Sequence, residues 1–145
     1  MALNYQRRLI SEQDYLEGER LSTIRHEYIN GDVYAMAGAS KNHDRIAGNV
    51  SRKLGNHLEN TPCELFSSDM KVKVGKDFFY PDVIVVCDDK TEDEYYTESP
   101  IIIVEVLSRS TRRTDQALKR LAYQNLHSLQ EYVLIEQDFV DVEIC

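Results

Sequence analysis

The sequence predicts an α/β domain with a central mixed β-sheet flanked by helices. Two runs of β-branched residues, YPDVIVVCD and PIIIVEVLS, are typical of strands buried on both faces of a sheet. Between Asn42 and Leu58, apolar residues recur at every fourth position, which predicts one stripe of an amphipathic helix. The helical period returns between Arg112 and Leu129, and the run EYVLIE follows as another buried strand. The apolar stripe predicted for this helix contains Leu118, Leu121, Ala122, Asn125 and Leu129. A strand, a helix and a strand in this order predict a right-handed parallel crossover.

The segments around this core carry local signals of their own. Ser11 fits the N-cap of a short helix through EQDYLEGER, which has acidic residues in its first turn. Asn30-Gly31 lies between two β-prone runs and predicts a two-residue hairpin turn. CELFSSDMKVKV is expected to form one more extended segment. FVDVEIC alternates apolar and polar residues, so we expect either a truncated chain or an exposed sheet edge.

Length and composition indicate one domain, spanning residues 1–145, with an ordinary globular core. No apolar run approaches the roughly 18–20 residues that cross a bilayer, and the first residues lack the hydrophobic core of a secretory signal. Cys63, Cys87 and Cys145 lie far apart and form no Cys-x-x-Cys pair. We therefore predict neither a disulfide framework nor a thiolate zinc site, and we expect a cytoplasmic location.

The formal net charge of −8 argues against nucleic-acid binding, which usually requires a basic patch. Much of the acid lies in CDDKTEDEYYTES, which is expected to be a solvated loop. The segment SRSTRRTDQALKR is locally basic, and it indicates either a nucleic-acid contact or a solvated helix start. Its basic residues are Arg109, Arg112, Arg113, Lys119 and Arg120.

Glu105 is the most informative acidic residue. Side chains alternate along a strand, and in PIIIVEVLS both faces of the strand are apolar, so the Glu105 carboxylate is expected to be buried. A buried ionised carboxylate costs several kcal/mol unless it is paired or binds a metal. The alternative is that Glu105 pairs with an arginine of the neighbouring basic segment or lies at a wet end of the sheet.

Asp82 favours the metal interpretation. It follows Pro81 at the start of its strand, and antiparallel pairing of the two buried runs would bring it close to Glu105. Two such carboxylates repel each other without a cation, and with one they form a hard-oxygen site for Mg²⁺ or Mn²⁺. We therefore expect Glu105→Gln to leave the metal-free protein equally stable or more stable. A bound Mg²⁺ suits phosphodiester hydrolysis.

Several motifs in order resemble those of the PD-(D/E)XK nuclease superfamily. They are the Pro81-Asp82 step, Glu105 in IVEVLS, the run EVLSRST, an Asp-x-x-x-Lys spacing and EYVLIE. More narrowly, the chain from about Arg25 onward resembles the "putative restriction endonuclease" family of bacterial genomes. The resemblance implies a restriction-endonuclease-like fold and Mg²⁺-dependent cleavage of DNA, with Asp82 and Glu105 as the metal ligands.

The chain departs from the superfamily pattern at the catalytic lysine. That lysine would lie two residues after Glu105, where this chain has Leu107. In related nucleases the following helix can supply the lysine, and Lys119, which borders the core-facing stripe of that helix, is the natural candidate. The alternative is an Asp115–Lys119 surface pair at i,i+4 spacing. Lys71 is a weaker substitute.

The resemblance also assigns roles to Glu27 and His43. Glu27 would add a carboxylate or a water-mediated metal contact, and His43 would donate to a phosphate at a helix N-terminus. The alternatives are a solvated hairpin acid and a histidine of the capping region. The other histidines, His26, His57 and His127, have no metal-ligand spacing and are expected to be structural.

The function predicted from these observations is a Mg²⁺-dependent DNA endonuclease that acts as a homodimer, with Asp82, Glu105, Lys119, Glu27 and His43 at its active site. A homodimer would supply the two sites that cutting both strands requires. Two alternatives stay open. One is an inactive nucleic-acid-binding or oligomerisation module, and the other is a hydrolase of a small phosphorylated metabolite.

Overall fold

The structure, a computed structural model, describes residues 9–108 and 114–145. The helices are α1 (Glu12–Leu21), α2 (Lys41–His57) and α3 (Thr114–Tyr123). The strands are β1 (His26–Ile29), β2 (Asp32–Ala35), β3 (Glu64–Ser67), β4 (Lys71–Val74), β5 (Asp77–Phe79), β6 (Val83–Val86), β7 (Tyr96–Thr97), β8 (Ile102–Leu107), β9 (Glu131–Glu136) and β10 (Val142–Ile144).

These strands form two mixed sheets, where the sequence predicted one central sheet. Sheet A has the order β2-β1-β5-β4-β7, and sheet B has the order β10-β9-β8-β6-β3. CELFSSDMKVKV was expected to be a single extended segment, but a turn closed by Met70 N–H and Ser67 O sends β3 to sheet B and β4 to sheet A. Gly75 then reverses the chain with φ +61°, and the additional strand β5 pairs with β4. The acidic loop also contains a short strand, β7.

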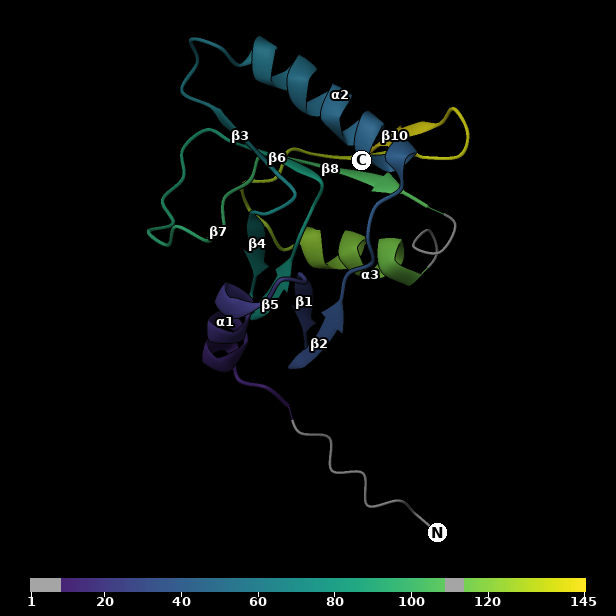
Figure 1. Ribbon diagram of the computed structural model, residues 1–145. Helices are drawn as coiled ribbons and strands as arrows, with labels where there is room; N and C mark the ends of the chain where they lie inside the picture. The colour runs from purple at the N-terminus through teal and green to yellow at the C-terminus, as the bar shows by residue number, and fades with distance from the viewer. Residues whose placement is uncertain (1–8, 109–113) are drawn as a thin grey trace.

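Sheet B agrees with the predicted strand pairing. β6 and β8 are antiparallel, with Val83 opposite Val104, and β8 and β9 are parallel through α3. Helix α2 packs on β3, β6 and β8, while α3 lies on the other face of the sheet (Figure 1). The main core lies on the α3 face, where Ile103 and Leu107 of β8 pack with Tyr123.

The N-terminal elements form as predicted. The Ser11 side chain caps α1 by accepting the Asp14 backbone N–H. Asn30 and Gly31 take φ values of 52° and 83°, the conformation that a tight hairpin turn requires. A buried ring of α1, Tyr15, stacks on Tyr28 of β1 and fixes the helix against sheet A.

Helix α3 is shorter than predicted, and it buries a different face. It ends at Tyr123, and short i→i+3 turns carry the chain from there to β9. Leu118 and Leu121, which the predicted stripe placed in the core, are 41% and 66% exposed. The buried face of the helix consists of Lys119 and Tyr123. The apolar pattern pointed to the wrong face, because the side of α3 that packs on sheet B carries Lys119 and Tyr123 and not the two leucines.

The prediction that the cysteines form no disulfide was wrong. Cys63 and Cys87 are bonded to each other, with 24 residues of sequence separation. They flank the antiparallel pair β3–β6, in which Glu64 lies opposite Val86, so pairing of the strands brings them together. Cys145 is free and exposed. The expectation of a cytoplasmic location therefore loses one of its grounds.

Of the basic segment, the structure describes Lys119 and Arg120, and these two do not form the surface patch that the sequence suggested. Arg109, Arg112 and Arg113 lie outside the described residues. Lys119 is buried, and Arg120 forms an ion pair with Glu143 at 2.9 Å. Within the described part of the chain, no helix is long and apolar enough to cross a membrane.

Candidate active site

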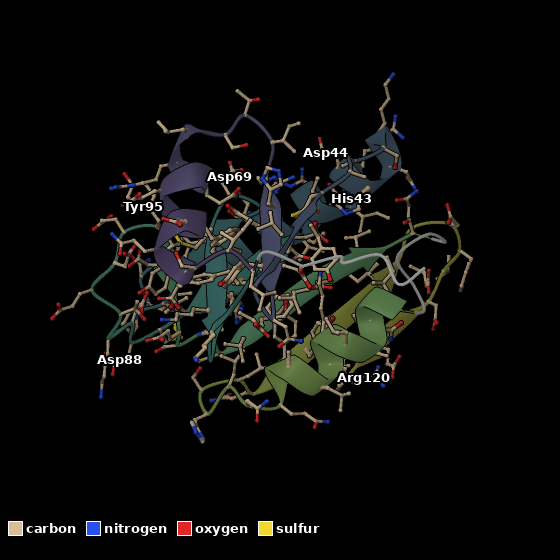
Figure 2. The ribbon with its side chains drawn as sticks, turned by 90° about the horizontal axis from the view of Figure 1, so that it is seen from below. His43, Asp44, Asp69, Asp88, Tyr95 and Arg120 are labelled. Carbon is tan, nitrogen blue, oxygen red and sulfur yellow. A yellow bond between two sulfur atoms is a disulfide. The ribbon has the colours of Figure 1, made fainter. Side chains whose placement is uncertain are left out.

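The five predicted site residues line one cavity of about 740 Å³. Glu27 comes from β1, His43 from the first turn of α2, Asp82 from the residue before β6, Glu105 from β8 and Lys119 from α3. These segments are far apart in the sequence, and the packing of both sheets with α2 and α3 brings them together. Figure 2 shows His43 next to Asp44 at the start of α2.

Asp82 and Glu105 lie on neighbouring strands of sheet B. The β6–β8 register pairs Val83 with Val104, so one further step puts Asp82 opposite Glu105. Opposed residues of an antiparallel pair point to the same face. Asp82 Oδ2 accepts the Val106 backbone N–H at 2.7 Å, which fixes its carboxylate at the rim of the cavity.

The Glu105 carboxylate is buried, with the residue 4% exposed. The Tyr123 hydroxyl donates to Oε1 at 3.0 Å, the Tyr132 hydroxyl donates to Oε2 at 3.1 Å, and the Lys119 ammonium lies 3.6 Å from Oε1. These contacts do not match a wet end of the sheet, and Arg109, Arg112 and Arg113, the alternative arginine partners, lie outside the described residues. Burial next to Glu105 raises the pKa of Tyr123 well above its ordinary value, so its hydroxyl keeps its proton and donates.

Both tyrosines escaped the sequence analysis as site residues. Tyr123 follows Lys119 by four residues, so both point from the same side of α3. Tyr132 lies on β9 opposite Ile103 of β8, two residues before Glu105. The sequence could have pointed to them, because both lie in segments predicted to pack next to the Glu105 strand, and a buried tyrosine needs a hydrogen-bond partner for its hydroxyl.

Lys119 also contacts Glu27. Its Nζ lies 3.2 Å from Glu27 Oε2, which in addition accepts the Tyr80 backbone N–H at 2.9 Å. Lys119 and Glu27 are 4% and 6% exposed, so neither is the solvated surface residue that the alternatives described. The side chain of Asp115 lies outside the described part of the structure. Two buried carboxylates thus share one buried ammonium.

His43 contacts the carboxylate oxygen of Asp82 that the Val106 backbone N–H does not use. Its Nε2 lies 3.3 Å from Asp82 Oδ1, and the hydrogen bond with Asp82 raises the pKa of the imidazole, partly offset by burial. Its backbone N–H is taken by the Ser40 side chain, the N-cap of α2. His43 therefore contacts the candidate metal ligand through its ring, and its backbone donor is already used.

A second hydrogen-bond network, formed by Glu19, Tyr80 and His26, meets the cavity at Tyr80. Glu19 accepts the Tyr80 hydroxyl at 2.6 Å and lies 2.7 Å from His26 Nδ1. Burial and the contact with Glu19 raise the pKa of the Tyr80 hydroxyl. Lys71, the weaker substitute for a catalytic lysine, lies against the Tyr80 ring and lines a separate pocket beside α1, so it does not reach the cavity.

The donor set of the cavity suits a hard divalent cation. Carboxylates from Glu27, Asp82 and Glu105 line it, and carboxylate oxygens are the ligands that Mg²⁺ prefers. Over residues 9–108 and 114–145, no three His, Cys, Asp or Glu side chains gather closely enough to hold an ion by themselves. Mg²⁺ commonly uses only one or two protein carboxylates, with waters and phosphate oxygens as its other ligands, so the residues present fit it.

Comparisons with known proteins agree with this geometry. Residues 12–145 match the Uma2 family model, described as "Putative restriction endonuclease". Two uncharacterised proteins of Synechocystis sp. are similar: slr1290, 36% identical over 93% of this chain and 73% of its own length, and sll1609, 34% identical over 94% and 80%.

The fold has a solved counterpart. The crystal structure of a "putative nuclease belonging to DUF820" from Anabaena variabilis superimposes with a TM-score of 0.72, covering 93% of this chain and 83% of that one, at 17% identity. At that identity the match establishes the restriction-endonuclease-like fold and nothing about residue roles. The family match covers nearly all of the chain, and the chain therefore belongs to the Uma2 family.

Proposed function

We propose that this protein is a Mg²⁺- or Mn²⁺-dependent endonuclease that hydrolyses DNA phosphodiester bonds in the cavity lined by both sheets, α2 and α3. The observation that supports this most is the position of Lys119. Its ammonium reaches the β8 carboxylate Glu105 from the following helix, at 3.6 Å, in a cavity that Asp82 also lines. An ammonium from α3 would supply the group that Leu107 lacks.

Each residue has a distinct role in this proposal. Asp82 and Glu105 hold the metal, which when bound neutralises charge on the phosphate and lowers the pKa of a water. Lys119 orients the attacking water and faces the charge that develops on the phosphate. Glu27 holds the Lys119 ammonium through its 3.2 Å contact, and His43 holds the Asp82 carboxylate. The Tyr123 and Tyr132 hydroxyls fix both oxygens of Glu105.

A homodimer and a cytoplasmic location are part of the proposal. Val142 and Ile144 on the edge strand β10 are exposed, and an edge strand offers unpaired backbone groups to a second copy. Two copies would bring two sites to one duplex. Sedimentation as a monomer at micromolar concentration would remove the dimer from the proposal.

Nicking of supercoiled plasmid DNA tests the proposed activity. We expect wild type to nick in millimolar Mg²⁺ and not in EDTA, and Glu105→Gln to lose nicking. Glu59→Gln, the same change at an exposed position, is the matched control and should nick like wild type. Circular dichroism checks that each variant is folded.

The same samples separate the alternatives. A folded wild type that binds DNA in a gel-shift assay and never nicks it is an inactive binding module. Release of phosphate from small phosphorylated metabolites without nicking would instead favour the metabolite hydrolase. In either case the endonuclease proposal fails.

A further inference from the structure

Helix α2 has a charge opposite to that of the whole chain. The protein has a formal net charge of −8, whereas α2 has four basic side chains, Lys41, Arg45, Arg52 and Lys53, against the single acid Asp44, which gives +3. All five are exposed. Across the described residues, none of the four basic groups forms an ion pair, and Arg52 donates only to the neighbouring amide of Asn49.

Three of these basic residues form a line along the outer face of the helix. At 3.6 residues per turn, Lys41, Arg45 and Arg52 lie within about 40° of one another around the axis. The opposite side of the helix, centred on Val50 and Leu54, packs on sheet B, so the basic line points away from the protein. With a rise of about 1.5 Å per residue, the line is roughly 16 Å long.

The basic line begins at the mouth of the candidate active site. Ser40 and His43, at the N-terminal end of α2, both line the cavity, and Lys41 lies between them in the sequence. Asp88 and Tyr95, in the acidic connection between β6 and β8, lie on the side of the molecule away from His43 (Figure 2). Helix α1, which has acids in its first turn, also lies apart from α2 (Figure 1). Among the described residues, α2 therefore presents a basic line at the mouth of the cavity, with the acidic segments placed away from it.

We propose that the outer face of α2 binds the phosphate backbone of duplex DNA and guides it to the cavity. The inference rests on the proposed nuclease function and names the surface that receives its substrate. At about 3.4 Å per nucleotide of one strand, a 16 Å line spans about five phosphates. Arginine and lysine contacts to phosphates set position without reading sequence, so this face gives binding that depends on salt and tolerates any sequence.

Fluorescence anisotropy of a labelled DNA duplex, in EDTA and over a range of salt concentrations, tests this surface apart from cleavage. Each phosphate contact contributes about 0.9 to the slope of log affinity against log salt. We expect the double variant Arg45→Ala/Arg52→Ala to bind more weakly and to reduce the slope by about 1.8. Lys76→Ala/Lys90→Ala removes the same charge from exposed positions outside α2, and it should keep the wild-type slope.

The outcomes separate this inference from the proposed function. An unchanged slope in the α2 variant, an equal loss in the control variant, or no binding of duplex DNA by wild type would each overturn it. Circular dichroism melts must show both variants folded like wild type, which the exposure of all four side chains leads us to expect. If wild type binds through α2 but never nicks plasmid DNA in Mg²⁺, the binding surface stands and the nuclease proposal fails.

Discussion

Lys119→Met tests whether the buried ammonium compensates the two acids beside it. The substitution removes the charge that lies 3.2 Å from Glu27 and 3.6 Å from Glu105, and it keeps an unbranched side chain on the same face of α3. Both carboxylates are more than nine-tenths buried, so water does not readily replace the lost counter-charge. We expect the variant to fold and to be markedly less stable.

The magnitude follows from what each acid retains. Removing one partner of a buried ion pair costs about 3–5 kcal/mol. Glu105 keeps two tyrosine hydroxyls, and Glu27 keeps the backbone N–H of Tyr80, so we expect a loss near the lower end, about 3 kcal/mol. For a chain of this size, the loss corresponds to a fall in Tm of roughly 9 °C.

Urea denaturation followed by circular dichroism measures this loss. Lys53→Met, the same change at an exposed position of α2, should stay within about 0.5 kcal/mol of wild type. The double variant Glu27→Gln/Lys119→Met removes one of the two acids and should recover part of the loss. A Lys119→Met protein as stable as the Lys53→Met control would show that the ammonium does not compensate the acids.

Three further predictions concern the contacts around this pair. Tyr123→Phe keeps the ring and removes one hydroxyl donor to a charged group, so urea denaturation should show a loss of about 1.5–3 kcal/mol. Reduction of the Cys63–Cys87 bond frees a loop with 24 residues of separation, which in the chain-entropy model costs about 3.5 kcal/mol, and melts with and without reductant check it. The hydrogen bond with Asp82 raises the pKa of His43 above its ordinary 6.5. The contribution of this contact to the stability of the fold is therefore complete below pH 6.5, as long as Asp82 stays ionised, and it is lost as pH rises through the raised pKa. The stability difference between wild type and His43→Ala should therefore shrink as pH increases.

The sequence predicted the parts of the fold that local chemistry decides. The Ser11 cap and the Asn30-Gly31 hairpin follow from signals within a few residues. The antiparallel pairing of the two buried runs was expected from the acids at their opposite ends, and the structure has it. The division into two sheets did not follow, because CELFSSDMKVKV contains no glycine or proline at its turn. The disulfide escaped for a related reason: its cysteines are brought together by pairing of β3 with β6, which separation in sequence does not reveal.

Predicting the candidate site from the sequence required knowing which side of α3 is buried. Apolar spacing favoured Leu118 and Leu121, and the structure instead buries Lys119 and Tyr123, because the acids of β1 and β8 lie beneath that side of the helix. A charged residue on a buried helix face is explained only by its partners, and those partners lie on other elements. The family resemblance pointed to Lys119, whereas periodicity alone placed it only at the border of the stripe.

The contacts of Glu105 reverse the expected effect of Glu105→Gln on the metal-free protein. From the sequence, Glu105 was expected to be an uncompensated acid beside Asp82, so that removing its charge would relieve repulsion. In the structure Glu105 accepts two tyrosine hydroxyls and lies 3.6 Å from the Lys119 ammonium, so a neutral amide weakens all three contacts. Glutamine should therefore destabilise the metal-free protein. A stabilising effect of millimolar Mg²⁺ on wild type, lost in the variant, remains the sign of a metal site, because a ligand that binds only the native state raises its stability.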